Sequence, residues 1–201
     1  SGNVYTTGYF HGTVDFNPGS GISNLTAHGG AGQSDIFISK LNQNGDFVWV
    51  KKIGAASTDA GRSITVDALG NIYTTGRFQG TVNFNPNPWG GSYSLTSSGN
   101  WDVFILKLHA NGNLLWAKNV GGTSDESGYS IDVDASGNVY TTGFFSGTVD
   151  FDPGAGIHDL ISSTSSSDIF ISKLNTNGQF VWAKNMGGTS SVSIGYDLSL
   201  D

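Results

Sequence analysis

The sequence predicts an all-β protein made of repeated antiparallel units of four strands each. Thirty glycines and several Asn-Gly pairs within 201 residues favour short strands joined by tight turns. No apolar pattern with the helical period continues beyond two turns, so long helices are not expected. Similar stretches recur at spacings of 68 and 67 residues, as the equivalent glycines Gly2, Gly70 and Gly137 show. We therefore expect one repeat domain over residues 1–201, with repeats of about 1–68, 69–135 and 136–201.

The clearest repeated stretch is a hairpin over residues 128–143, GYSIDVDASGNVYTTG. Ile131 and Val133 alternate with polar residues, which is the pattern of a half-buried strand. A Ser-Gly-Asn turn follows, and the β-branched and aromatic residues after it suit a return strand. The same hairpin recurs at residues 61–76. Its two halves also occur at the chain ends, as GYDLSLD at residues 195–201 and SGNVYTTG at residues 1–8.

Each repeat continues with Gly-Thr-Val, a Phe-Asn/Asp-Pro segment and a variable polar loop. One leucine in each loop is expected to point inward: Leu25, Leu95 and Leu160. A second hairpin follows, with Asn-Gly turns at residues 44–45, 111–112 and 177–178. Its return strands carry a recurring tryptophan, which we expect to pack between units: Trp49, Trp116 and Trp182. Each repeat thus holds four main strands, with a long excursion between the second and the third.

Composition excludes some classes of function. The net charge of −7 and the pI of about 4.7 argue against a nucleic-acid partner, because phosphate contacts need clustered Lys and Arg. No apolar run is long enough for a membrane span. The chain has no cysteine, so it has neither disulfides nor thiolate metal sites. Because it opens in mid-repeat and its only methionine is Met186, we expect a piece of a longer or processed protein.

Four-stranded antiparallel units that repeat along a chain are typical of β-propeller blades. The hairpin D-[IV]-F-[IV]-x-K-L-x-x-N-G, followed by G-Y-x-I-x-V-D-x-x-G-N-x-Y-x-T-G, resembles the SBBP-type β-propeller repeat of bacterial secreted and surface proteins. The likeness covers nearly the whole chain in three copies. It implies a propeller fold and a secreted or cell-surface location in a bacterium, and it implies little about activity.

Three blades are too few for a ring, since propellers have about four to eight. The chain begins with the second strand of a unit and ends with the first strand, so one blade is expected to be shared between the two ends. The residues expected to form this junction between chains are Tyr196, Leu198, Leu200, Val4 and Tyr5. The expected homo-oligomer is either a two-fold dimer of six blades or an open filament.

A calcium site is one hypothesis for the repeated hairpin. Asp132, Asp134 and Ser136 resemble the opening of a D-x-D-x-[DS]-G calcium loop. The equivalent positions in the other repeats depart from that pattern, and no glutamate stands at the twelfth loop position, which is Gly143. The alternative is a hairpin in which the aspartate caps the turn, and no cofactor is then expected.

A ligand platform is a hypothesis for the excursion of the second repeat. Trp89, Tyr93 and Trp101 lie within thirteen residues and have no equivalents in the other repeats. Such rings could stack on a sugar, or they could pack locally within the loop. The six lysines and three aspartates that recur in every unit, by contrast, predict structural contacts between lysine heads and carboxylates.

No catalytic residue is predicted. The four histidines occupy non-equivalent positions without metal or triad spacing, and Asp125-Glu126 in a linker is weak evidence for glycoside hydrolysis. The leading prediction is a non-enzymatic extracellular or surface scaffold for protein interaction or self-assembly. The alternatives are a carbohydrate-binding propeller that uses the loop aromatics and, from another class, a glycan hydrolase or lyase.

Overall fold

The computed structural model describes residues 2–30, 32–163, 166–189 and 191–201. Within these residues the chain forms strands β1 to β17 and no helix, and every pair of hydrogen-bonded strands is antiparallel. The prediction of an all-β antiparallel fold is therefore confirmed. The main strands are mostly seven residues long, and their hairpins turn at Asn-Gly, Leu-Gly or Ser-Gly pairs.

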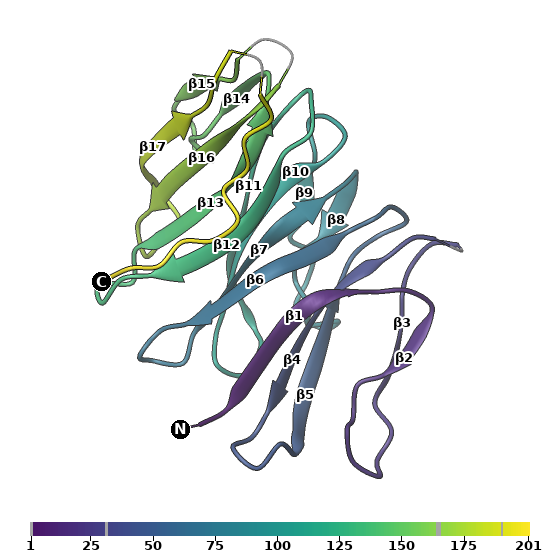
Figure 1. Cartoon of the computed structure of the whole chain (residues 1–201). Helices are drawn as coiled ribbons and strands as arrows, with labels where there is room; N and C mark the ends of the chain where they lie inside the picture. The colour runs from purple at the N-terminus through teal and green to yellow at the C-terminus, as the bar shows by residue number, and fades with distance from the viewer. Residues whose placement is uncertain (1, 31, 164–165, 190) are drawn as a thin grey trace.

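Three main sheets follow one another along the chain (Figure 1). The first sheet has the order β1-β4-β5: β1 (Val4–Phe10), β4 (Asp35–Leu41) and β5 (Phe47–Ile53). The second has the order β6-β7-β10-β11: β6 (Ala60–Val66), β7 (Ile72–Phe78), β10 (Asp102–Leu108) and β11 (Leu114–Gly122). The third has the order β12-β13-β16-β17: β12 (Ser127–Val133), β13 (Val139–Ser146), β16 (Ser167–Leu174) and β17 (Phe180–Met186).

The excursion in each repeat is not the plain loop that the sequence predicts, because it contains a small hairpin. The three hairpins are β2 (Thr13–Asp15) with β3 (Asn24–Thr26), β8 (Thr81–Asn83) with β9 (Ser94–Thr96), and β14 (Thr148–Asp150) with β15 (Asp159–Ile161). The last hairpin also pairs with the end of β11 and extends the second sheet to six strands. The inward leucines are half-buried as predicted, and Leu95 and Leu160 pack against the core.

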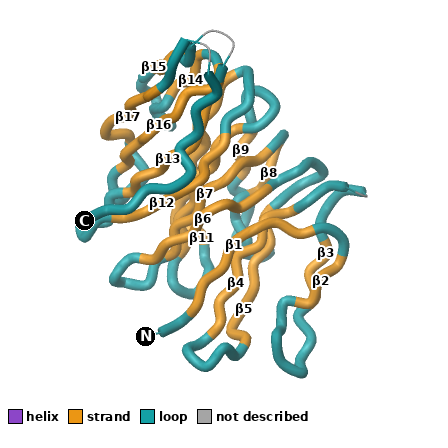
Figure 2. The backbone as a smooth tube through the Cα atoms, in the orientation of Figure 1, coloured by secondary structure: helices purple, strands orange, loops and turns teal. Residues whose placement is uncertain are grey.

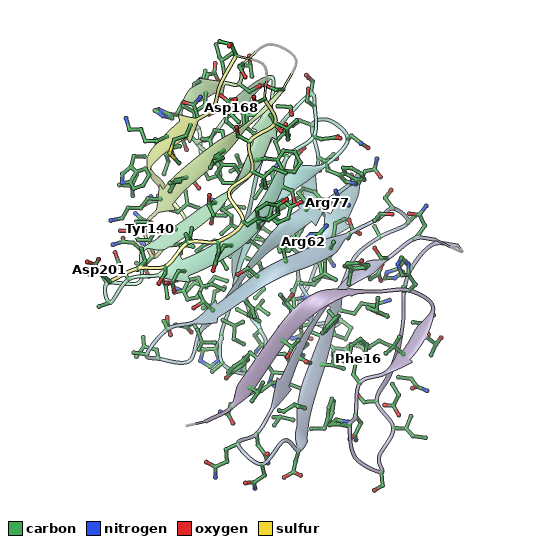
Figure 3. All side chains as sticks on the ribbon, viewed as in Figure 1. Phe16, Arg62, Arg77, Tyr140, Asp168 and Asp201 are labelled. Carbon is green, nitrogen blue, oxygen red and sulfur yellow. The ribbon has the colours of Figure 1, made fainter. Side chains whose placement is uncertain are left out.

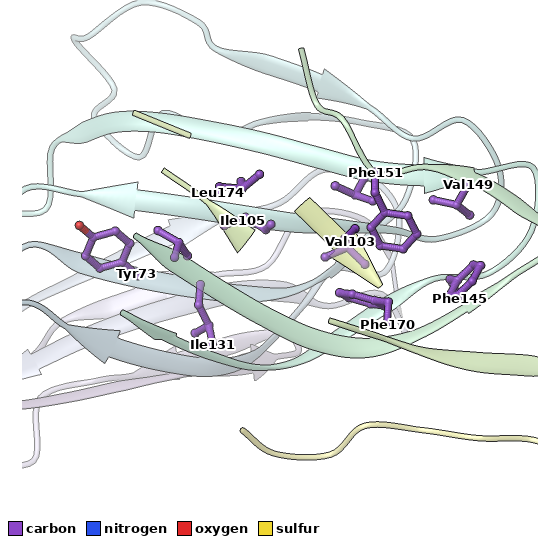
Figure 4. Close-up of a cluster of buried hydrophobic side chains, with 12 residues drawn as sticks. Tyr73, Val103, Ile105, Ile131, Phe145, Val149, Phe151, Phe170 and Leu174 are labelled. Atoms are coloured by element: carbon purple, nitrogen blue, oxygen red, sulfur yellow. The ribbon is translucent and has the colours of Figure 1, made fainter. Parts of the chain in front are cut away.

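The core lies between neighbouring sheets rather than within one. One buried cluster joins the first sheet to the second through residues such as Ile36, Ile38 and Phe104. The other joins the second sheet to the third through Ile105, Ile131 and their neighbours (Figure 4). Trp49 and Trp116 pack against these two clusters, as the sequence predicts.

The Phe-Asn/Asp-Pro segment anchors each excursion to its own sheet. Phe84 packs edge-on against Phe78, with ring centroids 5.2 Å apart, and tilts over Phe104 at 5.3 Å. Equivalent trios in the first and third repeats have nearly the same geometry. Because Phe84 and Phe151 are fully buried, this segment is part of the core.

The ends of the chain lie on different sheets. Figure 1 shows the N-terminus beside the first sheet and the C-terminus beside the third, and Figure 2 draws residues 195–201 as a loop that follows β12. In the described part of the chain, no strand pairing joins the first sheet to the third. One repeat domain with one blade shared between the ends therefore stays a prediction.

Candidate functional site

A glycine–threonine contact sets how closely each sheet approaches the one before it. A Cβ atom on Gly128 of β12 would collide with Thr75 Oγ1 of β7, and Gly61 has the same relation to Thr7. The threonine hydroxyl is fixed within its own sheet, since Thr75 Oγ1 donates to the Phe104 carbonyl oxygen over 2.7 Å. The contact therefore requires glycine at the start of each first strand.

Residues 195–201 meet the third sheet through the same contact. A Cβ atom on Gly195 would collide with Thr142 Oγ1, and the Gly195 N–H donates to the Gly143 carbonyl oxygen over 3.2 Å. Further along, Ser130 Oγ donates to Asp197 Oδ1 over 2.7 Å, and the Leu200 N–H donates to Asp132 Oδ2 over 3.2 Å. The segment thus occupies the place that the first strand of a following sheet would take.

The opposite end of the chain has the complementary feature. β6 and β12 each begin a four-stranded sheet, whereas β1 begins a sheet of three strands and pairs with β4 alone. Val4 is 51% exposed on this edge, and Tyr5 packs edge-on against Trp49. The five predicted junction residues therefore lie on two separate surfaces, one at each end of the row of sheets. Their pairing stays a prediction.

The aspartates of the calcium hypothesis are engaged within the hairpin. Asp134 Oδ1 accepts the N–H groups of Ser136 and Asn138, each over 2.9 Å. Asp134 Oδ2 accepts from Asn138 Nδ2 over 2.7 Å and from the Tyr140 hydroxyl over 3.2 Å. Burial alone would raise the pKa of Asp134, but these hydrogen bonds outweigh it and hold the pKa below its usual value.

The turn of the second repeat has the same geometry around Asp67, which accepts from Leu69, Asn71 and Tyr73. A cavity of about 260 Å³ lies between these two turns and is lined by Asp67, Asp134, Lys107 and Thr176 among others. In the described ranges, no three His, Asp or Glu side chains are placed to hold a metal ion. Both aspartates cap their turns, and a calcium site there stays a prediction. Asp132 lies two residues before Asp134 and accepts from the Leu200 N–H.

The aromatic residues of the second excursion are not brought together. Trp89 is 92% exposed in the turn beyond one end of the β8–β9 hairpin, and Trp101 lies beyond the other end. The Tyr93 hydroxyl donates to the Ala117 carbonyl oxygen over 3.2 Å. Trp101 is half-buried beneath the Arg77 guanidinium, whose carbon is 3.8 Å from the ring centroid. The three rings therefore share no common surface, and a ligand platform made of them stays a prediction.

The recurring lysines differ from the sequence prediction. Lys40, Lys107 and Lys173 lie over the rings of Tyr5, Tyr73 and Tyr140, at 5.1, 5.0 and 4.9 Å from the ring centroids. The expected carboxylate contact occurs for Lys173, whose Nζ lies 3.8 Å from Asp134 Oδ2. The tyrosine ring therefore takes the place assigned to a carboxylate, because the two side chains face each other across paired strands.

The recurring aspartates are buried at the start of each third strand. Asp35 Oδ2 lies 2.9 Å from His28 Nδ1 and 3.4 Å from Lys52 Nζ, whereas Asp102 accepts from Ser98 N–H and Asn119. Burial raises the pKa of Asp102. These carboxylates also pack against glycines of the following strand, so their role is structural.

Sequence analysis underrated Glu126, which is fully buried rather than free in a linker. Its Oε2 accepts the Gly122 N–H over 2.8 Å. Burial raises the pKa of Glu126 to about 7, and burial likewise raises the pKa of its equivalent Asp59 to about 6. The Glu126 N–H donates to the Trp101 carbonyl oxygen over 2.8 Å, and the Asp59 N–H donates to the Ser34 carbonyl oxygen over the same distance. Ser193 takes this place in the third repeat, where its N–H donates to the Ser167 carbonyl oxygen over 2.9 Å. The recurrence of one backbone contact marks these residues as linker anchors.

Sequence analysis missed Arg62 and Arg77, the only two arginines of the chain. They lie close together on β6 and β7 (Figure 3). The signal was present in the repeats: both follow the recurring glycines of the hairpin, where the other repeats carry aromatic residues.

Consecutive antiparallel sheets of three or four main strands, with their cores between them, are typical of propeller-type repeats. Residues 48–77, which run from β5 to β7, match the model of the SBBP family, described as a β-propeller repeat. The chain therefore carries the repeat that its sequence resembles, and that prediction is confirmed. The chain is also similar to a protein of Acanthamoeba polyphaga mimivirus named "Uncharacterized WD repeat-containing protein L264", with 30% identity over 203 residues. The match covers 91% of this chain and 14% of that relative's length.

Proposed function

We propose that this chain is a non-enzymatic scaffold that makes protein contacts by adding strands across its open sheet edges. The observation that carries the proposal is how residues 195–201 pack on the third sheet. Gly195 contacts Thr142 there as Gly128 contacts Thr75 in the second sheet. In the described part of the chain, this segment lies where the first strand of a following sheet would lie, and β1 pairs with β4 alone. Unpaired strand edges of this kind are templates for pairing with another chain.

The repeats supply the expected register of the new pair. In the second sheet Val66 lies opposite Ile72, and in the third Val133 lies opposite Val139. The equivalent pair at the junction is Leu200 with Val4, and Ser199 then faces Tyr5. Both partners therefore keep their apolar side chains on the face that packs against the core in the other sheets.

The proposed partner is a second copy of this chain, in a two-fold dimer of six blades or in an open filament. In a longer chain, the same pairing would join consecutive repeats. The SBBP-type repeat and the WD-repeat name of the mimivirus relative support a role in protein interaction. We further propose a secreted or cell-surface location, which rests on the resemblance to bacterial surface repeats. The structure has no helix, within the described residues, that is long and apolar enough to cross a membrane.

Disulfide cross-linking tests the register directly, because the natural chain has no cysteine. A protein with Val4→Cys and Leu200→Cys should form covalent dimers or higher species between chains under mild oxidation. The matched control combines Tyr9→Cys with Leu200→Cys, since Tyr9 lies on the same exposed strand but five positions from the expected partner.

Strong cross-linking of the first pair and little of the second would support strand addition in the expected register. Equal cross-linking of both pairs would indicate random collision, and a bond formed within one chain would place the ends of the same molecule together. Either result, or the absence of any cross-link, would overturn the proposal.

A further inference from the structure

A repeated β-bulge places one side chain of each first strand outside the regular pairing. In the pairing of β6 with β7 the register shifts between Gly61 and Ser63, which leaves Arg62 as the extra residue. The pairing of β12 with β13 shifts in the same place and leaves Tyr129 as the extra residue. A bulge of this kind re-aims a side chain, and bulges are over-represented beside binding and catalytic sites.

Arg62 and Tyr129 belong to an arginine–aromatic row that crosses β1, β6, β7 and β12. The row is made of Tyr9, Arg62, Arg77, Trp101, Tyr129 and Tyr196. The Arg62 guanidinium carbon lies 6.0 Å from the Tyr9 ring centroid and 5.5 Å from that of Tyr129. The Tyr129 and Tyr196 rings meet edge to face at 5.3 Å. The row therefore runs continuously from the first sheet to the C-terminal segment.

The residue type in the row differs between the repeats, whereas the neighbouring positions keep the same residue. The glycines before Arg62, Tyr129 and Tyr196 recur, and so do the threonines that those glycines contact. Those positions set the spacing of the sheets, whereas the adjacent bulge position carries Arg in one repeat and Tyr in the others. Variation in chemistry on an unvarying backbone is the arrangement expected of a surface that recognises a ligand.

The row is the site of unneutralised positive charge in an acidic chain. The net charge is −7, yet both arginines lie here, and no ion pair of either one occurs among the described residues. Asp125 is close enough for its charge to act on Arg77, but its carboxylate forms no ion pair with that arginine. Arg77 Nε is buried without a hydrogen-bond partner. A buried donor without a partner costs free energy unless a ligand or a water satisfies it.

The surface is also accessible. Tyr9 is 49% exposed and Tyr196 is 67% exposed, and Arg62 between them is exposed as well. A guanidinium that stacks on rings keeps its in-plane N–H donors free, and their fork matches the two oxygens of a carboxylate. The rings beside each guanidinium offer flat apolar contact to a group attached to that carboxylate.

We propose that the arginine–aromatic row binds a short carboxylated saccharide. Its carboxylate would lie between Arg62 and Arg77, and its sugar ring would pack on Tyr9 or Tyr129. A sugar acid carries a carboxylate for the guanidinium and a ring face for the adjacent tyrosine within one residue. It therefore matches the alternation of guanidinium groups and aromatic rings along the row. A long polyanion fits less well, because the acidic remainder of the chain repels it. Arg62 and Arg77 lie on β6 and β7, outside the two segments of the proposed junction, so binding of the carboxylate does not depend on strand addition between chains.

Titration calorimetry with sialyllactose and with digalacturonate tests the proposal, and lactose serves as the neutral counterpart of the first probe. The natural chain should bind at least one carboxylated probe and should not bind lactose measurably. The double variant Arg62→Gln with Arg77→Gln should bind that probe at least about tenfold more weakly. The matched control, Lys51→Gln with Lys118→Gln, removes the same charge from other strands and should bind normally.

Circular dichroism and the solution mass of both variants show whether fold and assembly are preserved, so a failure here is distinguishable from a failure of strand addition. Binding of neither carboxylated probe would overturn the proposal, as would equal binding of lactose. An equal loss of binding in the lysine control would show that the arginines act only through the overall charge, and it would also overturn the proposal. Stronger binding of an aspartate-rich peptide than of either saccharide would reassign the row to acidic peptides and overturn the sugar assignment.

Discussion

Glu126 shows how a single side chain carries the pH response of this fold. The carboxyl is fully buried and makes one hydrogen bond, to the Gly122 N–H. Burial raises its pKa from 4.5 to about 7, so the folded chain holds a proton that the unfolded chain has lost between these pH values. The free energy of unfolding therefore falls as the pH rises from about 4.5 to about 7 and stays lower above that. Asp59 acts in the same direction at lower pH.

Glu126→Gln should remove this part of the pH response. Glutamine keeps the shape of the protonated acid without its charge, so the variant should be more stable than the natural chain at pH 8. The gain should be on the order of 2 kcal/mol at pH 8 and close to zero at pH 4. Urea unfolding at the two pH values measures it, with exposed Asp159→Asn as the control. The same gain at both pH values would contradict the pKa assignment.

Gly128 is the residue on which the spacing of the second and third sheets depends. Gly128→Ala places a methyl group against Thr75 Oγ1 and should lower the free energy of unfolding by about 1–3 kcal/mol. Gly188→Ala is the matched control, because its added methyl group meets no atom within 4 Å and should change stability by less than about 0.5 kcal/mol. Thermal unfolding measures both. Equal effects of the two variants would show that the glycine–threonine contact is not tight.

At the scale of the element, the β6–β7 and β12–β13 hairpins are each held by their turn. Gly137 has φ 78° there, and Asp134 accepts four hydrogen bonds from the residues that follow it. The hairpin could be predicted because alternating apolar residues, a glycine turn and a β-branched return strand agree with one another. The small hairpins of the excursions could not, because three-residue strands leave no periodic pattern in the sequence.

Asp134→Ala separates turn capping from calcium binding. It removes four hydrogen bonds and should lower the free energy of unfolding by about 1–3 kcal/mol. Because capping needs no ion, the loss should be the same with added calcium and with EDTA, as thermal unfolding can show. Asp159→Ala, which changes an exposed carboxylate, should have little effect. A loss for Asp134→Ala that appears only in the presence of calcium would instead support the metal hypothesis.

At the scale of the whole molecule, the repeats predict the order of the sheets, and the structure shows how neighbouring sheets contact each other. Spacing identified equivalent residues, so the correspondence of residues 195–201 to a first strand and of β1 to a second strand could be predicted from sequence alone. The contact of residues 195–201 with the third sheet could not be predicted, because it depends on the close approach of Gly195 to Thr142. The arginine–aromatic row was missed for a related reason, since a β-bulge that turns Arg62 outward is invisible in a period-2 pattern.

The solution mass of the natural chain, measured by light scattering over a range of concentrations, tests the central claim most directly. Strand addition predicts a stable mass near twice 21.0 kDa for a closed pair, or a mass that climbs with concentration for a filament. A mass that stays at 21.0 kDa at every concentration would contradict it, because both open edges would then remain unpaired in the presence of their complement.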